Sequence, residues 1–576
     1  MIKVLKYLKG SAAICAIIAP LIMIIEVAMD LLQPTLMAKI IDVGVANGDL
    51  SYVFRIGTQM IIAAFVGLIA GVGCSIFASI ASMKLGESLR QGLFDKIQTL
   101  SFLEIDMLKT SSLITRLTND VTQIQNMVNM GLKMIVRAPF MCIGGLIMAV
   151  ALSPKLSMVF VYAIPIIVVS VIFILKKSLP LFKSVQEKID KINIVMRESI
   201  LGVRVIKSFA MEENQGERFD EVNNDLRDES IRSQNMNLIL WPIATLIMNL
   251  TVVAVLWFGG NMVNSGHIEV GKIMAFVNYL IQIMGSVIMT INIMMNFSRA
   301  QASCSRINEV LDTDSSIQDS KDPIKINNFD IEFRDVSFRY NKHSDNVLSN
   351  ISFKINQGET VGIIGSTGSG KSSLVNLIPR LYDASKGEVL IGGVNVAEIE
   401  IKELRENIGV VLQDSILFSG TIEDNLRFGN DHADIDLMES SVRDAQAYEF
   451  ISSKENTYKS EVEQRGRNLS GGQKQRLSIA RTLIRNPKIL IMDDASSALD
   501  MATEAKLQES LKNRMKDSTV IIIAQRISGV MDADKIIVMD DGEISEIGTH
   551  KELLINSEIY RSIAVSQLGE EVLSIV

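Results

Sequence analysis

The sequence has little cysteine, and its few cysteines form no recognisable pattern. Cys15, Cys74, Cys142 and Cys304 include no CxxC pair, and each lies in or beside an apolar segment. A free thiol in such surroundings usually packs as a small hydrophobic side chain. We therefore predict neither a disulfide nor a metal site built on cysteine.

The chain also lacks an excess of positive charge. Its 57 lysine and arginine residues are outnumbered by 65 aspartate and glutamate residues, which gives a net charge of −8 and an isoelectric point near 5.4. Binding to nucleic acid relies on a basic patch or stripe that attracts phosphates. The charge balance therefore argues against nucleic acid as a partner.

Apolar residues, in contrast, are abundant and unevenly distributed. They make up 48% of the chain, and the mean hydropathy of +0.28 is too apolar for a wholly soluble protein. A helix needs about 20 apolar residues to cross a hydrocarbon core about 30 Å thick. Because the first apolar run continues past Pro20, we interpret it as a membrane helix and not as a signal peptide. Six segments are long enough to span a membrane, at about 14–42, 56–82, 132–152, 156–176, 238–262 and 272–297.

Two long connections, at about 83–131 and 177–237, indicate the orientation of these segments. The second is rich in lysine and arginine, whereas the first, third and fifth connections are short and poor in cations. Because cytoplasmic loops carry the excess of cations, we predict that both long connections and both termini are cytoplasmic. No proline lies between Leu181 and Leu240, so the membrane helices should continue into these connections. Residues 1–310 would then form one transmembrane domain.

A second domain is predicted after a polar, proline-containing linker at 311–329, and it would occupy residues 330–576. Within it, TVGIIGSTGSGKSS contains the pattern G-x-x-x-x-G-K-S between a strand-like run and a helix-like run. Backbone N–H groups of such a loop surround phosphates, its lysine reaches the terminal phosphates, and its serine hydroxyl binds Mg²⁺. The predicted nucleotide-binding residues are Gly365, Ser366, Thr367, Gly368, Ser369, Gly370, Lys371, Ser372 and Ser373, with Ser372 also a Mg²⁺ ligand.

An apolar run, ILIM, ends in Asp493 and fits the second half of a nucleotide site. A carboxylate at the carboxyl end of a buried strand can hold Mg²⁺ through water. An apolar run followed by aspartate is common, so this feature supports a nucleotide site only in combination with the phosphate loop.

The pentapeptide LSGGQ, from Leu469 to Gln473, resembles the signature of ATP-binding cassette (ABC) proteins. The resemblance extends to Tyr340, which matches the aromatic that stacks on adenine, and to Gln413, which matches the glutamine that contacts Mg²⁺. It implies ATP and Mg²⁺ as cofactors, with Ser372, Gln413 and Asp493 as metal ligands. The signature residues Ser470, Gly471, Gly472 and Gln473 would act at the ATP site of a partner chain.

Six helices ahead of one cassette resemble a half-size ABC exporter over nearly the whole chain. The fold class implied is an all-α membrane domain of six transmembrane helices fused to a soluble α/β P-loop cassette. In that family two chains pair, and each ATP site lies between the phosphate loop of one chain and the signature of the other.

Two positions depart from the family pattern at the catalytic centre. Asp494 stands where the family has the glutamate that polarises the attacking water, and the shorter side chain withdraws its carboxylate by roughly 1.5 Å. Gln525 stands where the family has a histidine that contacts the γ-phosphate, and an amide can neither take up a proton nor become cationic. Gln464, before the signature, is a further departure from a common glutamate.

These departures resemble the degenerate-site subunit of bacterial heterodimeric ABC multidrug exporters. The resemblance implies a second, non-identical half-transporter, a bacterial cytoplasmic membrane, and small amphipathic drugs or lipids as substrates. Two alternatives stay open. One is a homodimeric lipid or peptide exporter in which Asp494 is the base, and the other is a regulatory subunit that binds nucleotide without turnover.

The membrane domain offers candidates for a transport pathway. Glu26 and Asp30 lie four residues apart in the first segment, and carboxylates inside a membrane are costly enough to suggest function. Packing against a polar neighbour is the alternative. Polar rows in the sixth segment either line a cavity or bond to neighbouring helices, and methionines there suit varied apolar ligands or fill the core. The polar rows are Asn278, Gln282, Ser286 and Thr290, and Asn292 with Asn296.

Overall fold

The computed structural model describes residues 2–341 and 344–569 and divides into two compact units. The first unit comprises Met1–Gln98 and Thr110–Asp312, and the second comprises Thr99–Lys109 and Thr313–Val576. The side chains of some residues in the membrane helices lie outside the described part. Among the predicted positions these are Thr290, Asn292 and Asn296.

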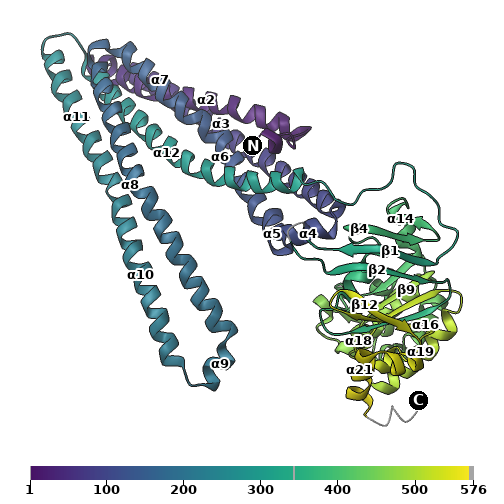
Figure 1. The fold of residues 1–576 in the computed structure, drawn as a ribbon. Helices are drawn as coiled ribbons and strands as arrows, with labels where there is room; N and C mark the ends of the chain where they lie inside the picture. Colours follow the sequence, from purple (N-terminus) through teal and green to yellow (C-terminus); the bar gives the residue numbers. More distant parts are fainter. Residues whose placement is uncertain (1, 342–343, 570–576) are drawn as a thin grey trace. The chain divides into compact units, whose positions relative to one another are not determined.

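The first unit is built entirely from helices (Figure 1). A π-helical segment continues α2 as η1, and two others, η2 and η3, join α5, α6 and α7 into one rod. In chain order the elements are α1 (Ile2–Leu5), α2 (Ser11–Lys39), η1 (Ile40–Val45), α3 (Leu50–Thr99), α5 (Thr110–Thr115), η2 (Arg116–Asp120), α6 (Val121–Met130), η3 (Gly131–Ile135), α7 (Val136–Leu152), α8 (Pro154–Leu201), α9 (Val203–Ser208), α10 (Glu212–Leu238), α11 (Leu240–Asn264) and α12 (Val270–Asp312).

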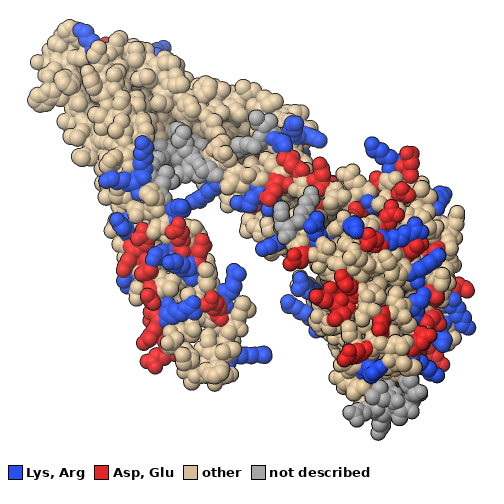
Figure 2. All heavy atoms as spheres, in the orientation of Figure 1, with Lys and Arg blue, Asp and Glu red and all other residues tan. Residues whose placement is uncertain are grey.

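Six helical rods of this unit are long and apolar enough to cross a membrane, which confirms the predicted six-helix membrane domain. On the face shown in Figure 2, charged side chains are nearly absent from one end of the helix bundle and frequent on the α8–α10 extension. The spans are Ser11–Val45, Leu50–Thr99, Thr110–Leu152, Pro154–Leu201, Glu212–Asn264 and Val270–Val287.

The long connections of the sequence are helical continuations of the membrane helices. α8 starts where the Ser153 hydroxyl accepts a hydrogen bond from the Leu156 N–H, with Pro154 in the first turn, a position that tolerates proline. α10 then returns beside α8, and α9 joins them at the tip (Figure 1). An ion pair of 2.9 Å between Arg218 and Glu198 links the two helices.

Among its described residues the second unit contains two large sheets, a small two-stranded sheet of β7 and β8, and a set of covering helices. A four-stranded antiparallel sheet has the order β2-β1-β4-β5, and a six-stranded sheet has the order β12-β11-β3-β10-β9-β6. The six-stranded sheet is parallel except for its edge strand β12, which pairs antiparallel with β11. The strands are β1 (Ile331–Phe338), β2 (Leu348–Ile355), β3 (Thr360–Gly365), β4 (Lys386–Ile391), β5 (Val394–Asn395), β6 (Ile408–Val411), β7 (Gly420–Thr421), β8 (Glu461–Val462), β9 (Ile489–Asp493), β10 (Thr519–Ile523), β11 (Lys535–Asp540) and β12 (Glu543–Gly548).

The central strands β3, β9 and β10 lie side by side in register, with Ile363 opposite Ile523 and Ile523 opposite Asp493. Their apolar residues are buried on both faces, as expected for a parallel strand covered from both sides. The carboxyl ends of parallel strands meet at one edge, so the segments that follow these three strands converge there. The helices of this unit are α13 (Lys371–Asn376), α14 (Ile401–Asn407), α15 (Ile422–Arg427), α16 (Ile435–Asp444), α17 (Tyr448–Ser452), α18 (Gly471–Leu483), α19 (Met501–Arg514), α20 (His550–Asn556) and α21 (Glu558–Leu568).

Helix α4 (Phe102–Leu108) belongs to the second unit, although the sequence placed all of residues 1–310 in one domain. The Glu104 side chain is buried and accepts a hydrogen bond from the Ser316 N–H at 3.2 Å. The Tyr382 hydroxyl donates to the Asp106 carboxylate at 2.9 Å. These long-range contacts fix α4 on the cassette, and no pattern local to the helix reveals them.

Candidate functional site

The predicted phosphate loop joins β3 to α13 and has the backbone that such a loop requires. Gly368 and Gly370 adopt φ values of 90° and 92°, a conformation open to glycine and strained for other residues. The Lys371 ammonium donates to the carbonyl oxygens of Gly365, at 3.0 Å, and Ser366, at 2.7 Å. Burial lowers the pKa of Lys371, while Asp493 and Asp494 oppose that shift. The lysine ammonium is therefore held by carbonyl oxygens of its own loop.

Two oxygen donors for a divalent cation lie together beside this loop. The Ser372 hydroxyl donates to Asp493 Oδ1 at 3.0 Å, at the carboxyl end of β9. Burial raises the pKa of Asp493, an effect that a nearby cation would oppose. Hydroxyl, carboxylate and amide oxygens are the ligands that Mg²⁺ prefers, so Ser372, Asp493 and Gln413 fit that ion by chemistry.

Both departures from the family pattern meet at one carboxylate. Asp494 Oδ2 accepts a hydrogen bond from Gln525 Nε2 at 2.9 Å and a longer one from Gln413 Nε2 at 3.4 Å. The Asp494 backbone has a φ of 50°, and its N–H donates to the Ile523 carbonyl at 3.0 Å. Burial raises the pKa of Asp494, whereas both amide hydrogen bonds lower it.

These groups line one cavity of about 350 Å³. It brings together the phosphate loop, the two aspartates, Gln413 and Gln525. Of the predicted nucleotide-binding residues, Thr367, Gly368, Gly370, Lys371, Ser372 and Ser373 are among the lining residues. Gly365 and Ser366 line a neighbouring cavity of about 500 Å³, together with Gln525 and residues of α21. Ser369 is buried beneath the loop.

Tyr340 lies beside the phosphate loop. Its hydroxyl is 2.8 Å from Ser373 Oγ, and its side chain remains 38% exposed. The ring packs edge-on against Tyr382, with 5.2 Å between centroids, and Tyr382 also bonds to Asp106 of α4. Tyr382 therefore connects the predicted adenine-stacking residue with α4, a link that sequence reasoning missed because the two segments are 276 residues apart.

The signature lies apart from this cavity. Ser470 caps α18, its hydroxyl accepting from the Gln473 N–H while the Gln473 side chain accepts from the Ser470 N–H. Ser470 and Gly471 are exposed, and no residue from Leu469 to Gln473 is among the described residues that line the nucleotide cavity. A signature presented outward is available to another chain.

A second residue that sequence reasoning missed is Gln567, on α21. Its Oε1 accepts from the Ile527 N–H and its Nε2 donates to the Gln525 carbonyl, both at 2.8 Å. One side chain thus holds both backbone groups that flank the Gln525–Ile527 turn. Nothing in the local sequence of α21 signals this role, because the contact depends on how α21 packs.

In the membrane unit, the predicted polar row on α12 is only partly described. The Asn278 side chain donates to the Met274 carbonyl and the Ser286 hydroxyl donates to the Ile283 carbonyl, both within α12. Gln282 Oε1 is buried without a hydrogen-bond partner among the described residues. Glu26 and Asp30 have a partner that sequence reasoning missed, because both form ion pairs with Arg137 of α7.

Comparison with known proteins agrees with this fold and site. A family model described as the ABC transporter transmembrane region matches residues 16–287, and one described as ABC transporter matches residues 348–497. The chain belongs to the ABC transporter family, and it is a multi-pass membrane protein that couples an ATPase cassette to transport. ABC exporters function as dimers, which agrees with a signature that faces away from its own nucleotide cavity.

Two relatives and one solved structure show how far the similarity extends. The chain is 41% identical over 571 residues to an uncharacterized ABC transporter ATP-binding protein of Bacillus subtilis, YfiB, with 99% of each chain covered. It is 36% identical over 493 residues, 85% of each chain, to YgaD of the same organism, provisionally named as a multidrug export ATP-binding/permease protein. A bacterial Atm1-family ABC exporter with ATP bound superposes with a TM-score of 0.81 at 25% identity, covering 96% of this chain and 98% of that one.

Proposed function

We propose that this chain is the degenerate-site subunit of a heterodimeric exporter in a bacterial cytoplasmic membrane, with both termini on the cytoplasmic side. It binds ATP at its own phosphate loop and hydrolyses that ATP only weakly. Its signature completes the hydrolytic site of a non-identical partner. The transported molecules are amphipathic drugs or lipids, a class supported by the name of YgaD.

The observation that carries the proposal is the pair of amides bonded to Asp494. A general base needs a free lone pair within about 2.6 to 3.2 Å of the proton that it removes. In this chain Gln525 and Gln413 donate to the same oxygen, Oδ2, and stabilise the carboxylate in place. Hydrogen bonds to the charged form of a carboxylate make it a weaker base. The two hydrogen bonds therefore oppose uptake of a proton by this carboxylate and compete with an attacking water for Oδ2.

The length of the side chain adds to this effect. Aspartate is one methylene shorter than the glutamate of the family pattern, which withdraws the carboxylate by roughly 1.5 Å. A displacement of about 1 Å can reduce the rate of a positioned reaction by about 10²-fold. Gln525, unlike histidine, offers the γ-phosphate a neutral donor only.

Binding of ATP does not require these groups. Mg²⁺, when bound, would supply positive charge that offsets the charge of the phosphates. Ser372 and Asp493 are placed to hold that ion, and Lys371 would leave the carbonyls of its own loop for the terminal phosphates. Tyr340, partly exposed beside the loop, offers a ring for the adenine. The subunit thus retains nucleotide and supports closure of the dimer.

A homodimeric exporter is the second candidate, and one observation favours it. Burial raises the pKa of Asp494, which moves the carboxylate toward the range of a useful general base. In that case Gln525 and Gln413 would have to release Oδ2 when ATP binds.

The test is to purify the tagged full chain from its native membrane, identify any co-purifying half-transporter, and compare ATPase rates of the chain alone and of the pair. We expect the chain alone to bind ATP with turnover well below about one per second, the lower end for ordinary enzymes. The pair should hydrolyse ATP at an ordinary rate. A chromatographically verified homodimer with ordinary turnover would favour the second candidate.

A further inference from the structure

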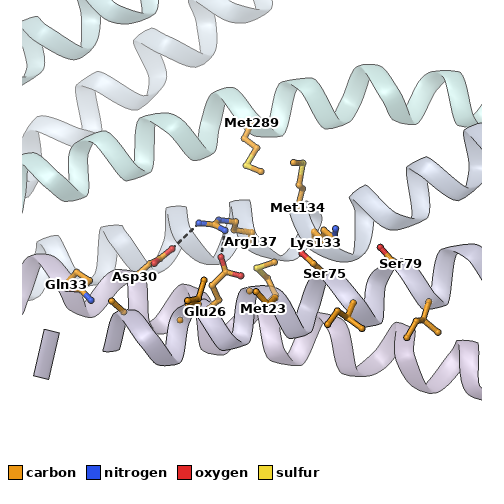
Figure 3. A pocket seen from close by; sticks show the side chains of 17 residues that line it. Met23, Glu26, Asp30, Gln33, Ser75, Ser79, Lys133, Met134, Arg137 and Met289 are labelled. Carbon is orange, nitrogen blue, oxygen red and sulfur yellow. Dashed lines mark hydrogen bonds and ion pairs between the residues drawn. The ribbon is translucent and has the colours of Figure 1, made fainter. Parts of the chain in front are cut away.

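The membrane unit contains a cavity of about 1090 Å³ between four helices (Figure 3). Residues of α2, α3, α7 with its preceding η3 segment, and α12 line it. Of the 17 lining residues, ten are aliphatic, methionine or glycine, and Leu68, Val72 and Ile76 of α3 are more than half exposed. A cavity of this size and character suits the apolar part of an amphiphile.

One end of the cavity carries surplus negative charge. The Arg137 guanidinium forms ion pairs with two carboxylates, Glu26 and Asp30, the second at 3.0 Å (Figure 3). One cation facing two anions leaves a net charge of about one negative unit. The Glu26 side chain is only 13% exposed, whereas the Asp30 side chain is 38% exposed. Asp30 is therefore the carboxylate within reach of a ligand.

The other end carries surplus positive charge. Lys133 lies one turn before Arg137 on the same rod, about 6 Å along the axis. Among the side chains that the structure describes, no carboxylate pairs with Lys133 and none accepts a hydrogen bond from it. Ser75 lies beside it, and Ser79 follows one turn further along α3 (Figure 3). The Ser79 oxygen accepts from Asn129 Nδ2, so its hydroxyl proton can still be donated.

The two surplus charges are complementary, yet they are held apart across the cavity. A charge inside a membrane is costly unless it is paired, and this arrangement leaves one of each sign without a full partner. A ligand with only an anion would satisfy Lys133 and leave the carboxylates in surplus. A ligand with only a cation would do the reverse. A molecule that carries both charges satisfies both ends.

We propose that this cavity binds a zwitterionic amphiphile, with its anion on Lys133 and the Ser75 and Ser79 hydroxyls, and its cation on Asp30. The apolar chain packs on the aliphatic residues of α3 and on Met23, Met134 and Met289. The assignment rests on the proposed export of amphipathic molecules. It restricts the transported molecules to those that carry one positive and one negative charge. Arg137 acts as a positioning residue, because it holds both carboxylates toward the same side of α2.

Binding of three tail-matched fluorescent amphiphiles to the purified full chain tests the charge class. The probes are lysophosphatidylethanolamine, a zwitterion; lysophosphatidylglycerol, an anion; and an alkyl trimethylammonium, a cation. Anisotropy titrations are run in nonionic maltoside micelles without nucleotide. We expect the zwitterion to bind about tenfold more tightly than either other probe, which corresponds to about 1.4 kcal/mol.

Two substitutions separate the ends of the cavity. Lys133→Gln should weaken the zwitterion and the anion about tenfold and leave the cation unchanged. Asp30→Asn should weaken the zwitterion and the cation about tenfold and leave the anion unchanged. Lys133→Arg, which keeps the charge, should retain binding, and Lys39→Gln, which removes an exposed lysine at the end of α2, is the matched control. Only the zwitterion should respond to both changes.

The proposal is overturned if the anion or the cation binds as tightly as the zwitterion, or if both substitutions leave all three affinities unchanged. Size-exclusion elution of each variant establishes that it is folded. Because binding is measured without ATP and without a partner, its failure would not bear on the degenerate site, and a failure of the heterodimer would not alter these affinities.

Discussion

The Gln525 amide donates a hydrogen bond to the Asp494 carboxylate, with 2.9 Å between Nε2 and Oδ2. Both residues replace the catalytic types of the family pattern, and in the structure each is a hydrogen-bond partner of the other. Their contact arises because β9 and β10 are parallel neighbours whose carboxyl ends meet. Because the two side chains are bonded to each other, they should be substituted together.

Restoring the family residues should restore hydrolysis at this phosphate loop. Asp494→Glu with Gln525→His lengthens the base and frees it from the amide, so we expect the ATPase rate at this site to rise about ten- to a hundredfold. The measurement is ATPase of the complex in which the partner's own base has been removed. Asp494→Asn with Gln525→His is the control and should show no gain. An unchanged rate in the double variant would indicate further losses, with Gln464 the first to examine.

In the proposed heterodimer, the signature and the phosphate loop of this chain should differ in importance. Ser470→Arg places a bulky cation at the partner's hydrolytic site and should nearly abolish ATPase and transport. Lys371→Ala affects only the degenerate site, so hydrolysis should persist at a reduced rate while ATP retention weakens. Steady-state ATPase and dye efflux at matched expression measure both. Greater damage from Lys371→Ala would reverse the assignment of the two sites.

Tyr382 contacts α4, which lies between the membrane helices α3 and α5 in the chain, so Tyr382→Phe should uncouple nucleotide binding from transport. The substitution removes the 2.9 Å bond to Asp106 and keeps the ring against Tyr340. We expect unchanged ATP affinity and a several-fold lower ratio of substrate transported to ATP hydrolysed. Tyr458→Phe removes a hydroxyl that has no partner among the described residues and should leave the ratio unchanged. Equal ratios for both variants would contradict a coupling role.

Gln567→Ala should loosen the turn that carries Gln525. It removes two hydrogen bonds of 2.8 Å, each worth about 1 kcal/mol. Hydrogen exchange on the full chain should show faster exchange at the Ile527 amide, by about tenfold. Gln508→Ala is a suitable control, because Gln508 donates only long bonds, of 3.4 Å, to the next two carbonyls of the turn. Exchange at Ile527 should not change in that variant.

The C-terminal helices should be less stable in acid. His550 Nδ1 lies 2.6 Å from the Tyr560 hydroxyl, and burial lowers the pKa of His550 below its ordinary value. The unfolded state then binds the proton more readily, so this contribution is complete above the ordinary histidine pKa of 6.5 and is lost as the pH falls. After correction for intrinsic exchange, hydrogen exchange of α20 and α21 should be faster at pH 5.5 than at pH 7.5, values about one unit either side of that pKa. In His550→Gln, the corrected exchange rates at the two pH values should be nearly equal.

The sequence by itself determined the features whose chemistry is carried by neighbouring residues. The six apolar spans, the glycine-rich loop around Lys371 and the aspartate after ILIM each express a local rule, since hydrophobic length, backbone freedom and strand ends are all local. For the same reason the two departures at Asp494 and Gln525 were visible without a structure. The family pattern then placed those separate motifs in one site.

Only the tertiary structure decided which distant side chains meet. Arg137 reaches Glu26 and Asp30 across 111 and 107 residues, Tyr382 reaches Asp106 across 276, and Gln567 reaches Gln525 across 42. Such contacts depend on the rotation and height at which helices pack, and a shift of one residue turns a side chain by about 100° around a helix of 3.6 residues per turn. Sequence periodicity leaves that register open because many apolar surfaces pack comparably well. The buried charges have far fewer acceptable partners, so their pairing depends on the packed structure.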